Sequence, residues 1–141
     1  MNHKKTLVLV FSLFPSFLFS SITVDGKLDE PEWKKAQSIS DFVTVYPNDK
    51  SKPKFKTEVR VFSDDKGIYF GFTNEQPIET HTPLKHPRDK WFVDADRNFI
   101  MIDFDGNATV GYEFSLTLGD TLRDAIVTNE NEMSDSWDAI W

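Results

Sequence analysis

Val110-Gly111-Tyr112-Glu113-Phe114-Ser115-Leu116-Thr117-Leu118 is a run in which apolar and polar side chains alternate. A period of two residues is typical of a β-strand with one covered face. We expect the apolar side chains to point inward, namely Tyr112, Phe114, Leu116 and Leu118. We expect the polar ones to point outward, namely Glu113, Ser115 and Thr117. This strand would need paired neighbours on both sides.

The flanking sequence supplies candidate neighbours. Short strands are predicted at 22–24, 42–46, 57–62, 68–72, 99–104 and 121–128, and another begins at 137. The loop 63–67 joins two of them as a hairpin. Residues 28–36 favour one short helix, with Asp29 as its cap and Pro31 in its first turn.

This pattern predicts an all-β fold, an antiparallel β-sandwich of the jelly-roll or immunoglobulin-like kind with one short N-terminal helix. The chain stops at Trp141 within an apolar pattern. We therefore expect an incomplete domain whose C-terminal strands are missing.

Residues 1–21 have the features of a secretory signal peptide. Lys4 and Lys5 precede an apolar run from Thr6 to Phe19, and small residues follow at Ser20 and Ser21. The run is shorter than the roughly 18–20 residues that span a bilayer. We expect cleavage and export to the periplasm, the outer membrane or the exterior, with 22–141 as one domain. An uncleaved membrane anchor is the alternative.

Charge and cysteine content narrow the possible functions. The formal net charge is −7, and removal of Lys4 and Lys5 with the leader makes it −9. Such an acidic chain would repel phosphates, which argues against nucleic acid as a partner. The chain has no cysteine, so a disulfide scaffold and a thiolate metal site are excluded.

The opening of the predicted domain reads Ile22-Thr23-Val24-Asp25-Gly26-Lys27-Leu28-Asp29-Glu30-Pro31-Glu32-Trp33. Together with the later segments 58–61, 67–71, 96–103, 111–114 and 137–141, taken in order, it resembles carbohydrate-binding module family 9. The resemblance is to the variety that precedes a large uncharacterised C-terminal region in secreted or outer-membrane bacterial proteins. It implies non-catalytic binding of an oligosaccharide or polysaccharide, a role in carbohydrate catabolism, and a larger C-terminal domain continuous with this one.

The resemblance also points to site residues. In that family a Trp just before the central strand forms one wall of the sugar site, and Trp91 occupies the corresponding place. Its charged neighbours could bind hydroxyls, and we predict a carbohydrate site formed by Trp91, Arg88, Asp94 and Asp96. The alternative is that Trp91 packs on the rim of the sheet.

The other tryptophans are interpreted as structural. Trp33 shares a predicted helix with Leu28 and is expected in the core, while Trp137 and Trp141 alternate along a predicted strand.

Other chemistries have weaker support in the sequence. Calcium is an alternative at Asp103, Asp105 and Asn107, but their spacing also fits a β-turn, which we favour. No other cofactor or metal is expected: His81 and His86 lack further ligands at zinc spacing. No carboxylate pair is marked out for glycoside hydrolysis. Two alternatives to sugar binding stay open: a structural or sensor accessory domain of an outer-membrane protein, and part of a glycoside hydrolase.

Overall fold

The computed structural model describes residues 22–90, 93–129 and 131–141. These residues form seven strands and two short 3-10 helices, so the fold is mostly β with almost no helix, as the sequence predicts. The strands make two sheets, one of three strands and one of four. Neither 3-10 helix could span a membrane. The predicted signal peptide lies outside the described residues and stays a prediction.

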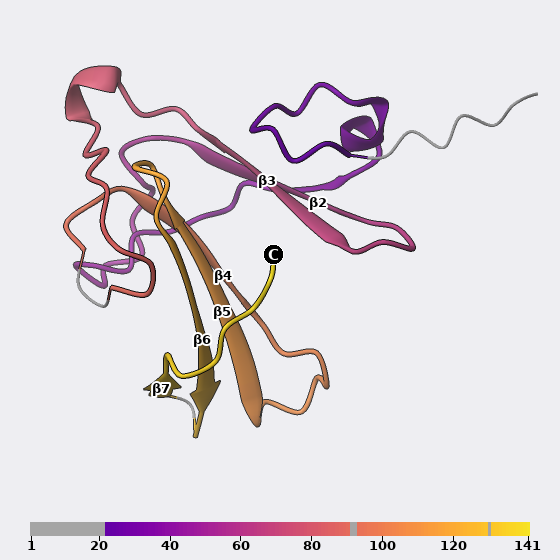
Figure 1. Ribbon diagram of the computed structural model, residues 1–141. Coiled ribbons are helices and arrows are strands. Elements are labelled where there is room, and N and C mark those ends of the chain that lie inside the picture. The colour runs from indigo at the N-terminus through magenta and orange to yellow at the C-terminus, as the bar shows by residue number, and fades with distance from the viewer. Residues whose placement is uncertain (1–21, 91–92, 130) are drawn as a thin grey trace, which may run out of the picture. The chain divides into compact units, whose positions relative to one another are not determined.

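The three-stranded sheet has the order β1 (Gln37–Ile39), β2 (Thr57–Ser63) and β3 (Ile68–Asn74). The predicted hairpin of 57–62 and 68–72 is thereby confirmed, and Figure 1 shows its two long strands side by side. Asp64 closes the turn, because its Oδ1 accepts hydrogen bonds from the N–H groups of Lys66 and Gly67.

The predicted strand at 42–46 is absent. Residues 40–56 run without regular structure, and β1 lies upstream of them. Val45 and Tyr46 are 78% and 94% exposed. The alternating side chains therefore find no surface that would cover one face, which a stable strand at that place would need.

The chain divides into two compact units. The smaller unit consists of the described residues up to Ser38 together with Arg60–Gly71, and the larger unit consists of Ile39–Val59 and Phe72–Trp141.

Trp33 is the buried centre of the smaller unit, 5% exposed, which confirms its predicted place in the core. It lies on a 3-10 helix, η1 (Pro31–Lys34), a single short turn where 28–36 had suggested a longer helix. Its indole N–H donates to Glu30 Oε2 at 2.9 Å, and the other Glu30 oxygen accepts from the N–H of Thr23. These bonds, that from Thr23 foremost, lower the pKa of Glu30.

Residues 22–24 form no strand, contrary to the expectation. They are held by the Glu30 carboxylate instead of by a neighbouring strand. Gly71 allows this part of the unit to close, because a Cβ there would overlap the side chains of Leu28 and Trp33.

The larger unit contains the four-stranded antiparallel sheet (Figure 1). Its order is β4 (Arg97–Ile102), β5 (Val110–Thr117), β6 (Leu122–Thr128) and β7 (Glu132–Ser134). The strands predicted at 99–104, 110–118 and 121–128 correspond to β4, β5 and β6. A second 3-10 helix, η2 (Ile78–Thr80), lies between the two sheets in sequence.

The prediction that only the apolar face of β5 is covered was wrong, although Tyr112 and Phe114 on that face are half-buried. Glu113, Ser115 and Thr117 are buried, whereas Leu116 and Leu118 are 43% and 49% exposed. The polar face can be inside because Glu113 and Thr117 have hydrogen-bonding partners. The Glu113 carboxylate accepts a hydrogen bond from the guanidinium of Arg123. Arg123 lies on β6, opposite Ser115. The Thr117 hydroxyl accepts from the N–H of Thr121.

The opposite face of β5 is covered at Tyr112 and Phe114 by aromatic side chains of the last residues. Trp137 contacts Tyr112 and Phe114 at ring-centroid distances of 5.0 and 5.9 Å, and Trp141 contacts Phe114 at 5.4 Å. Residues 137–141 form no strand, so that prediction was wrong, although both tryptophans do pack on β5. Side-chain contacts therefore help to hold this segment, which pairs with no strand.

Candidate functional site

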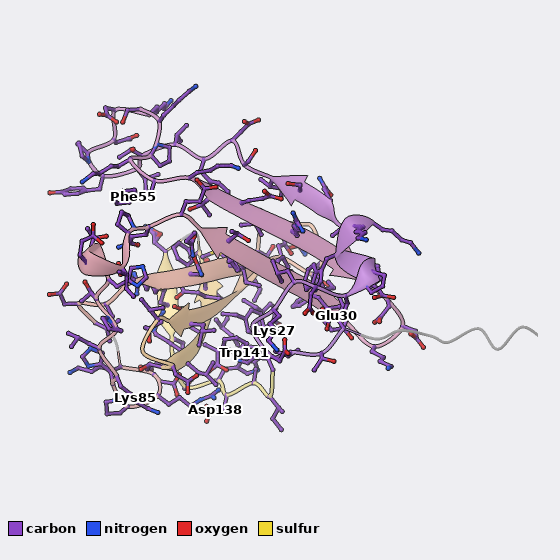
Figure 2. The ribbon with its side chains drawn as sticks, turned by 90° about the horizontal axis from the view of Figure 1, so that it is seen from above. Lys27, Glu30, Phe55, Lys85, Asp138 and Trp141 are labelled. Atoms are coloured by element: carbon purple, nitrogen blue, oxygen red, sulfur yellow. The ribbon has the colours of Figure 1, made fainter. Side chains whose placement is uncertain are left out.

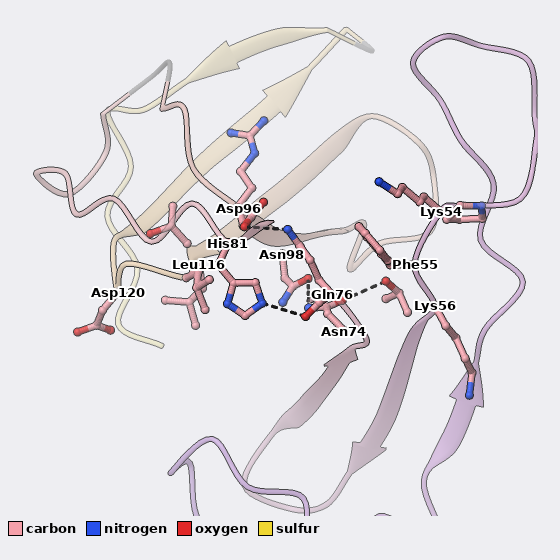
Figure 3. Close-up of a pocket in the computed structure, with 15 residues that line it drawn as sticks. Lys54, Phe55, Lys56, Asn74, Gln76, His81, Asp96, Asn98, Leu116 and Asp120 are labelled. Carbon is pink, nitrogen blue, oxygen red and sulfur yellow. Dashed lines mark hydrogen bonds between the residues drawn. The ribbon is translucent and has the colours of Figure 1, made fainter. Parts of the chain in front are cut away.

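The larger unit has an open pocket of about 720 Å³ (Figure 3). Four of its segments supply the lining, 53–57, 74–81, 96–98 and 116–120. They are the approach to β2, the end of β3 with η2, the start of β4, and the β5–β6 turn. Because these positions are far apart in sequence, only the folded unit brings their side chains together.

A chain of hydrogen bonds that joins one hydroxyl and two amide groups crosses the pocket. Thr57 Oγ1 donates to Asn74 Oδ1 at 3.0 Å, and Asn74 Nδ2 donates to Asn98 Oδ1 at 3.2 Å. The Nδ2 group of Asn98 has no acceptor among the described residues, so it is free to donate to a ligand. Bonds in series fix the orientation of each amide and thus which atom it presents.

Asp96 holds the neighbouring part of the pocket together. Its Oδ2 accepts from the N–H of Thr82 at 2.8 Å and from Gln76 Nε2 at 3.2 Å. His81 lies beside them, with its Nε2–H donating to the Gln76 carbonyl at 3.0 Å. Within the described residues, Asp96 Oδ1 has no donor. Oδ2 of this half-buried carboxylate is already hydrogen-bonded, whereas Oδ1 can still accept a hydrogen bond from a ligand hydroxyl.

Apolar surface lies on both sides of these polar groups. Figure 3 shows Phe55 on one side of Asn74 and Gln76 and Leu116 on the other. Phe55 is half-buried, and Leu116 and Leu118 are the side chains of β5 and its turn that the sheet leaves exposed. The pocket therefore offers hydrogen-bonding groups between apolar walls.

Basic side chains stand at the same pocket. Lys54 Nζ lies 5.0 Å from the centroid of the Phe55 ring, and Lys56 Nζ lies 3.6 Å from Glu75 Oε1. Arg97 also lines the pocket, and its Cζ lies 5.9 Å from the Phe99 ring centroid.

The four residues predicted as a sugar site do not all meet here. Asp96 lines the pocket. Asp94 is exposed, and Arg88 belongs to a different cluster of side chains. Trp91 lies outside the described residues, so its predicted stacking role stays a prediction. The sequence did not point to Asn74, Gln76, Asn98 or Phe55. An amide at the end of β3 and another near the start of β4 are a weak signal that only the fold makes meaningful.

Arg88 contacts three carboxylates. Its Nη2 lies 2.7 Å from Asp124 Oδ2, and its Nε lies 3.3 Å from Asp89 Oδ2 and 3.4 Å from Asp138 Oδ1. In the described chain, these three acids are the one group whose carboxylate oxygens are close enough to share a metal ion, all within 4.8 Å. The Arg88 guanidinium balances part of their charge.

Asp124 is the centre of that cluster, and its side chain is fully buried. Besides Arg88, its Oδ2 accepts from the N–H of Ala139 at 2.9 Å and from the indole N–H of Trp141 at 3.0 Å. Arg88 Nη2 also donates to the Ala139 carbonyl. Figure 2 labels Asp138 and Trp141 on this C-terminal segment. The cluster fastens the segment to β6.

Asp103, the first residue of the alternative calcium set, is engaged by its own loop. Its Oδ1 accepts from the N–H groups of Asp105 and Gly106, and its Oδ2 accepts from that of Ala108 at 2.7 Å. These bonds, that from Ala108 first, lower the pKa of the carboxyl group. This is the hydrogen bonding of a turn, as the spacing favoured.

No family model matches the chain, and neither a curated protein nor a solved structure matches it. The arguments for function therefore rest on the residues and geometry of the pocket.

Proposed function

We propose that the larger unit binds a saccharide non-covalently in this pocket. The observation that carries the proposal is the lining itself, in which Asn98 Nδ2 and Asp96 Oδ1 lie among apolar walls that include Phe55 and Leu116. Asn98 Nδ2 is available as a donor and Asp96 Oδ1 as an acceptor, and hydrogen bonds within the protein already orient both side chains.

A sugar ring suits such a lining. One face of a pyranose presents C–H groups, which can lie on the Phe55 ring or the leucine side chains. The hydroxyls at its rim both donate and accept, and so can bond Asp96 Oδ1 and Asn98 Nδ2 together. Because these groups are held by Gln76, Thr82 and Asn74 before the ligand arrives, little ordering remains to oppose binding.

The proposal extends to the fold and to the place of action. We take the two sheets as the halves of a β-sandwich similar to carbohydrate-binding module family 9. The leader of residues 1–21 would export the module, as its Lys4–Lys5 start and apolar run suggest. N-terminal sequencing of the exported protein should find a start near Ser21 or Ile22. A start at Met1 on membrane-bound protein would contradict cleavage.

The binding test is titration calorimetry of the purified protein against a broad set of oligosaccharides. Asn98→Ala should weaken binding of the best ligand about tenfold, because a donor and the end of the amide chain are both lost. Asn131→Ala is the matched control, since Asn131 is exposed and outside the pocket. If no saccharide binds, the alternative of a structural or sensor accessory domain takes the place of this proposal.

A hydrolase would need two carboxylates about 5–10 Å apart at the bond to be cleaved. The acids of the lining are Asp96, which holds Thr82 and Gln76, and Asp120, whose side chain is 87% exposed. The binding proposal expects no release of reducing sugar from the bound glycan. Turnover that disappears in Asp96→Asn would overturn it.

A further inference from the structure

The pocket differs in charge from the chain as a whole. Acidic side chains outnumber basic ones by 23 to 16 in the sequence. In the lining the balance is reversed, with Lys54, Lys56 and Arg97 against Asp96 and Asp120. An excess of basic groups at one concave place of an acidic protein indicates a ligand of opposite sign.

The acids of the lining are partly occupied by other groups. Asp96 accepts from Gln76 and Thr82, and Asp120 faces Lys85 at 4.0 Å, a residue outside the lining. Lys56 is paired with Glu75. Lys54 and Arg97 have no acidic partner among the described residues, and each lies over an aromatic ring instead.

The position of Lys54 connects this charge to the apolar wall. Its ammonium group lies 5.0 Å from the centroid of Phe55, which among the described residues is the one phenyl ring of the lining. A sugar placed on that ring would come into contact with the ammonium group. A neutral sugar would displace the ammonium from the ring and give it no charged partner in return. A sugar with a carboxylate would replace the cation–π contact with an ion pair.

We infer that the ligand of this pocket is an acidic saccharide, one that contains uronic acid residues. The inference rests on the proposed saccharide binding and specifies its substrate class. In the bound state the carboxylate lies at Lys54, while the hydroxyls bond Asp96 Oδ1 and Asn98 Nδ2. Arg97 adds a second positive charge to the lining.

The experiment compares trigalacturonic acid with its methyl ester, which has the same rings and no charge. Titration calorimetry of the purified protein at low salt should give about tenfold tighter binding of the acid. The difference should shrink as sodium chloride is raised from about 0.05 to 0.5 M, because exposed ion pairs are screened.

Variants then locate the charge. Lys54→Gln should weaken binding of the acid about threefold, as expected for an exposed ion pair, and leave the ester unchanged. Lys52→Gln is the matched control, because Lys52 is exposed in the same segment but outside the lining, and it should bind as the parent does. A Lys54→Gln variant that binds the acid as well as the parent would overturn the inference.

Two other outcomes distinguish failure of this inference from failure of the saccharide-binding proposal. If the ester or neutral oligosaccharides bind as tightly as the acid, the inference fails and the saccharide proposal stands. If neither acidic nor neutral saccharides bind, both fail.

Discussion

Asp124 and Asp96 belong to the same unit, and each accepts a backbone N–H from a distant segment, Ala139 in one case and Thr82 in the other. Asp124 is fully buried, and its Oδ2 is surrounded by donors from the loop at 88 and from the last residues. Asp96 is half-buried, and its Oδ1 is uncommitted within the described residues. The two carboxylates therefore differ in accessibility: solvent can reach Asp96 but not Asp124.

The comparison shows how burial divides the roles of two similar carboxylates. A buried charge costs several kcal/mol unless it is compensated, so Asp124 depends on Arg88. A half-exposed carboxylate keeps its hydration and can exchange water for a ligand hydroxyl. We therefore expect changes around Asp124 to affect stability first, and changes around Asp96 to affect binding first.

The largest effect is expected for Arg88→Ala. It leaves the Asp124 carboxylate buried without its counter-charge and should lower the free energy of unfolding by about 3 kcal/mol. Urea unfolding followed by tryptophan fluorescence measures it. Lys90→Ala, an exposed residue of the same loop, should change it by less than about 0.5 kcal/mol. If Arg88→Ala is stable but loses saccharide binding, Arg88 belongs to a sugar site as its sequence context predicted, and the comparison fails.

A smaller loss is expected for Trp141→Phe. Phenylalanine keeps a ring near Phe114 but removes the indole N–H that donates to Asp124 Oδ2 at 3.0 Å. The loss should be about 1–2 kcal/mol, as for a hydrogen bond to a charged group. Trp137→Phe serves as control, because within the described residues the Trp137 indole N–H has no acceptor. Equal losses for the two variants would show that ring packing alone holds the C-terminal segment.

For Asp96→Asn we expect less than about 1 kcal/mol of stability loss, since the amide oxygen can still accept from Thr82. Affinity for the best saccharide should fall about tenfold, because an amide is a weaker acceptor than a carboxylate. Thermal melts and calorimetry on the same preparation separate the two quantities. A variant that melts as early as Arg88→Ala would mean that Asp96 is as structural as Asp124.

The smallest effect concerns a third carboxylate, Asp103, whose hydrogen bonds within the described residues come from its own loop. Its pKa in the folded state is below the ordinary value of 3.8, so its contribution is present above that pH and is lost as pH falls through the folded-state pKa. Hydrogen exchange of the Gly106 and Ala108 amides should therefore be slowed at pH values above 3.8, and this protection should disappear as the pH falls well below 3.8. In the Asp103→Asn variant, the protection of the same amides should change little with pH, because asparagine does not titrate in this range. Loss of protection across β5 in acid would indicate that the loop is not an independent unit.

The local sequence predicted much of the strand content but not which surfaces are covered. The 57–74 hairpin and strands β5 and β6 follow from alternation and turn residues, which act over a few neighbours. Alternation defines two faces of a strand and leaves open which one is buried. That depended on Arg123 pairing with Glu113 from another strand.

The site was harder to predict for a related reason. Asp96 was predicted as a site residue and lines the candidate pocket. Asn74, Asn98 and Phe55 reach the same pocket from separate segments, and nothing in their own surroundings marks them. Arg88 was chosen for its charge beside an aromatic residue, and that charge is engaged by Asp124, 36 positions away. Pairings over such separations depend on the tertiary fold.

Gly119 in the β5–β6 turn lies against the backbone of another segment, where a Cβ would overlap the carbonyl group of Leu84. Even alanine would push the turn away from the segment between Thr82 and Asp96, whose ends are joined by a hydrogen bond from the Asp96 N–H to the Thr82 carbonyl. In a saturation-mutagenesis library this position would tolerate almost nothing, and a screen for binding would score it beside true contact residues. A readout of folded protein abundance, measured in parallel, would separate this spatial constraint from recognition.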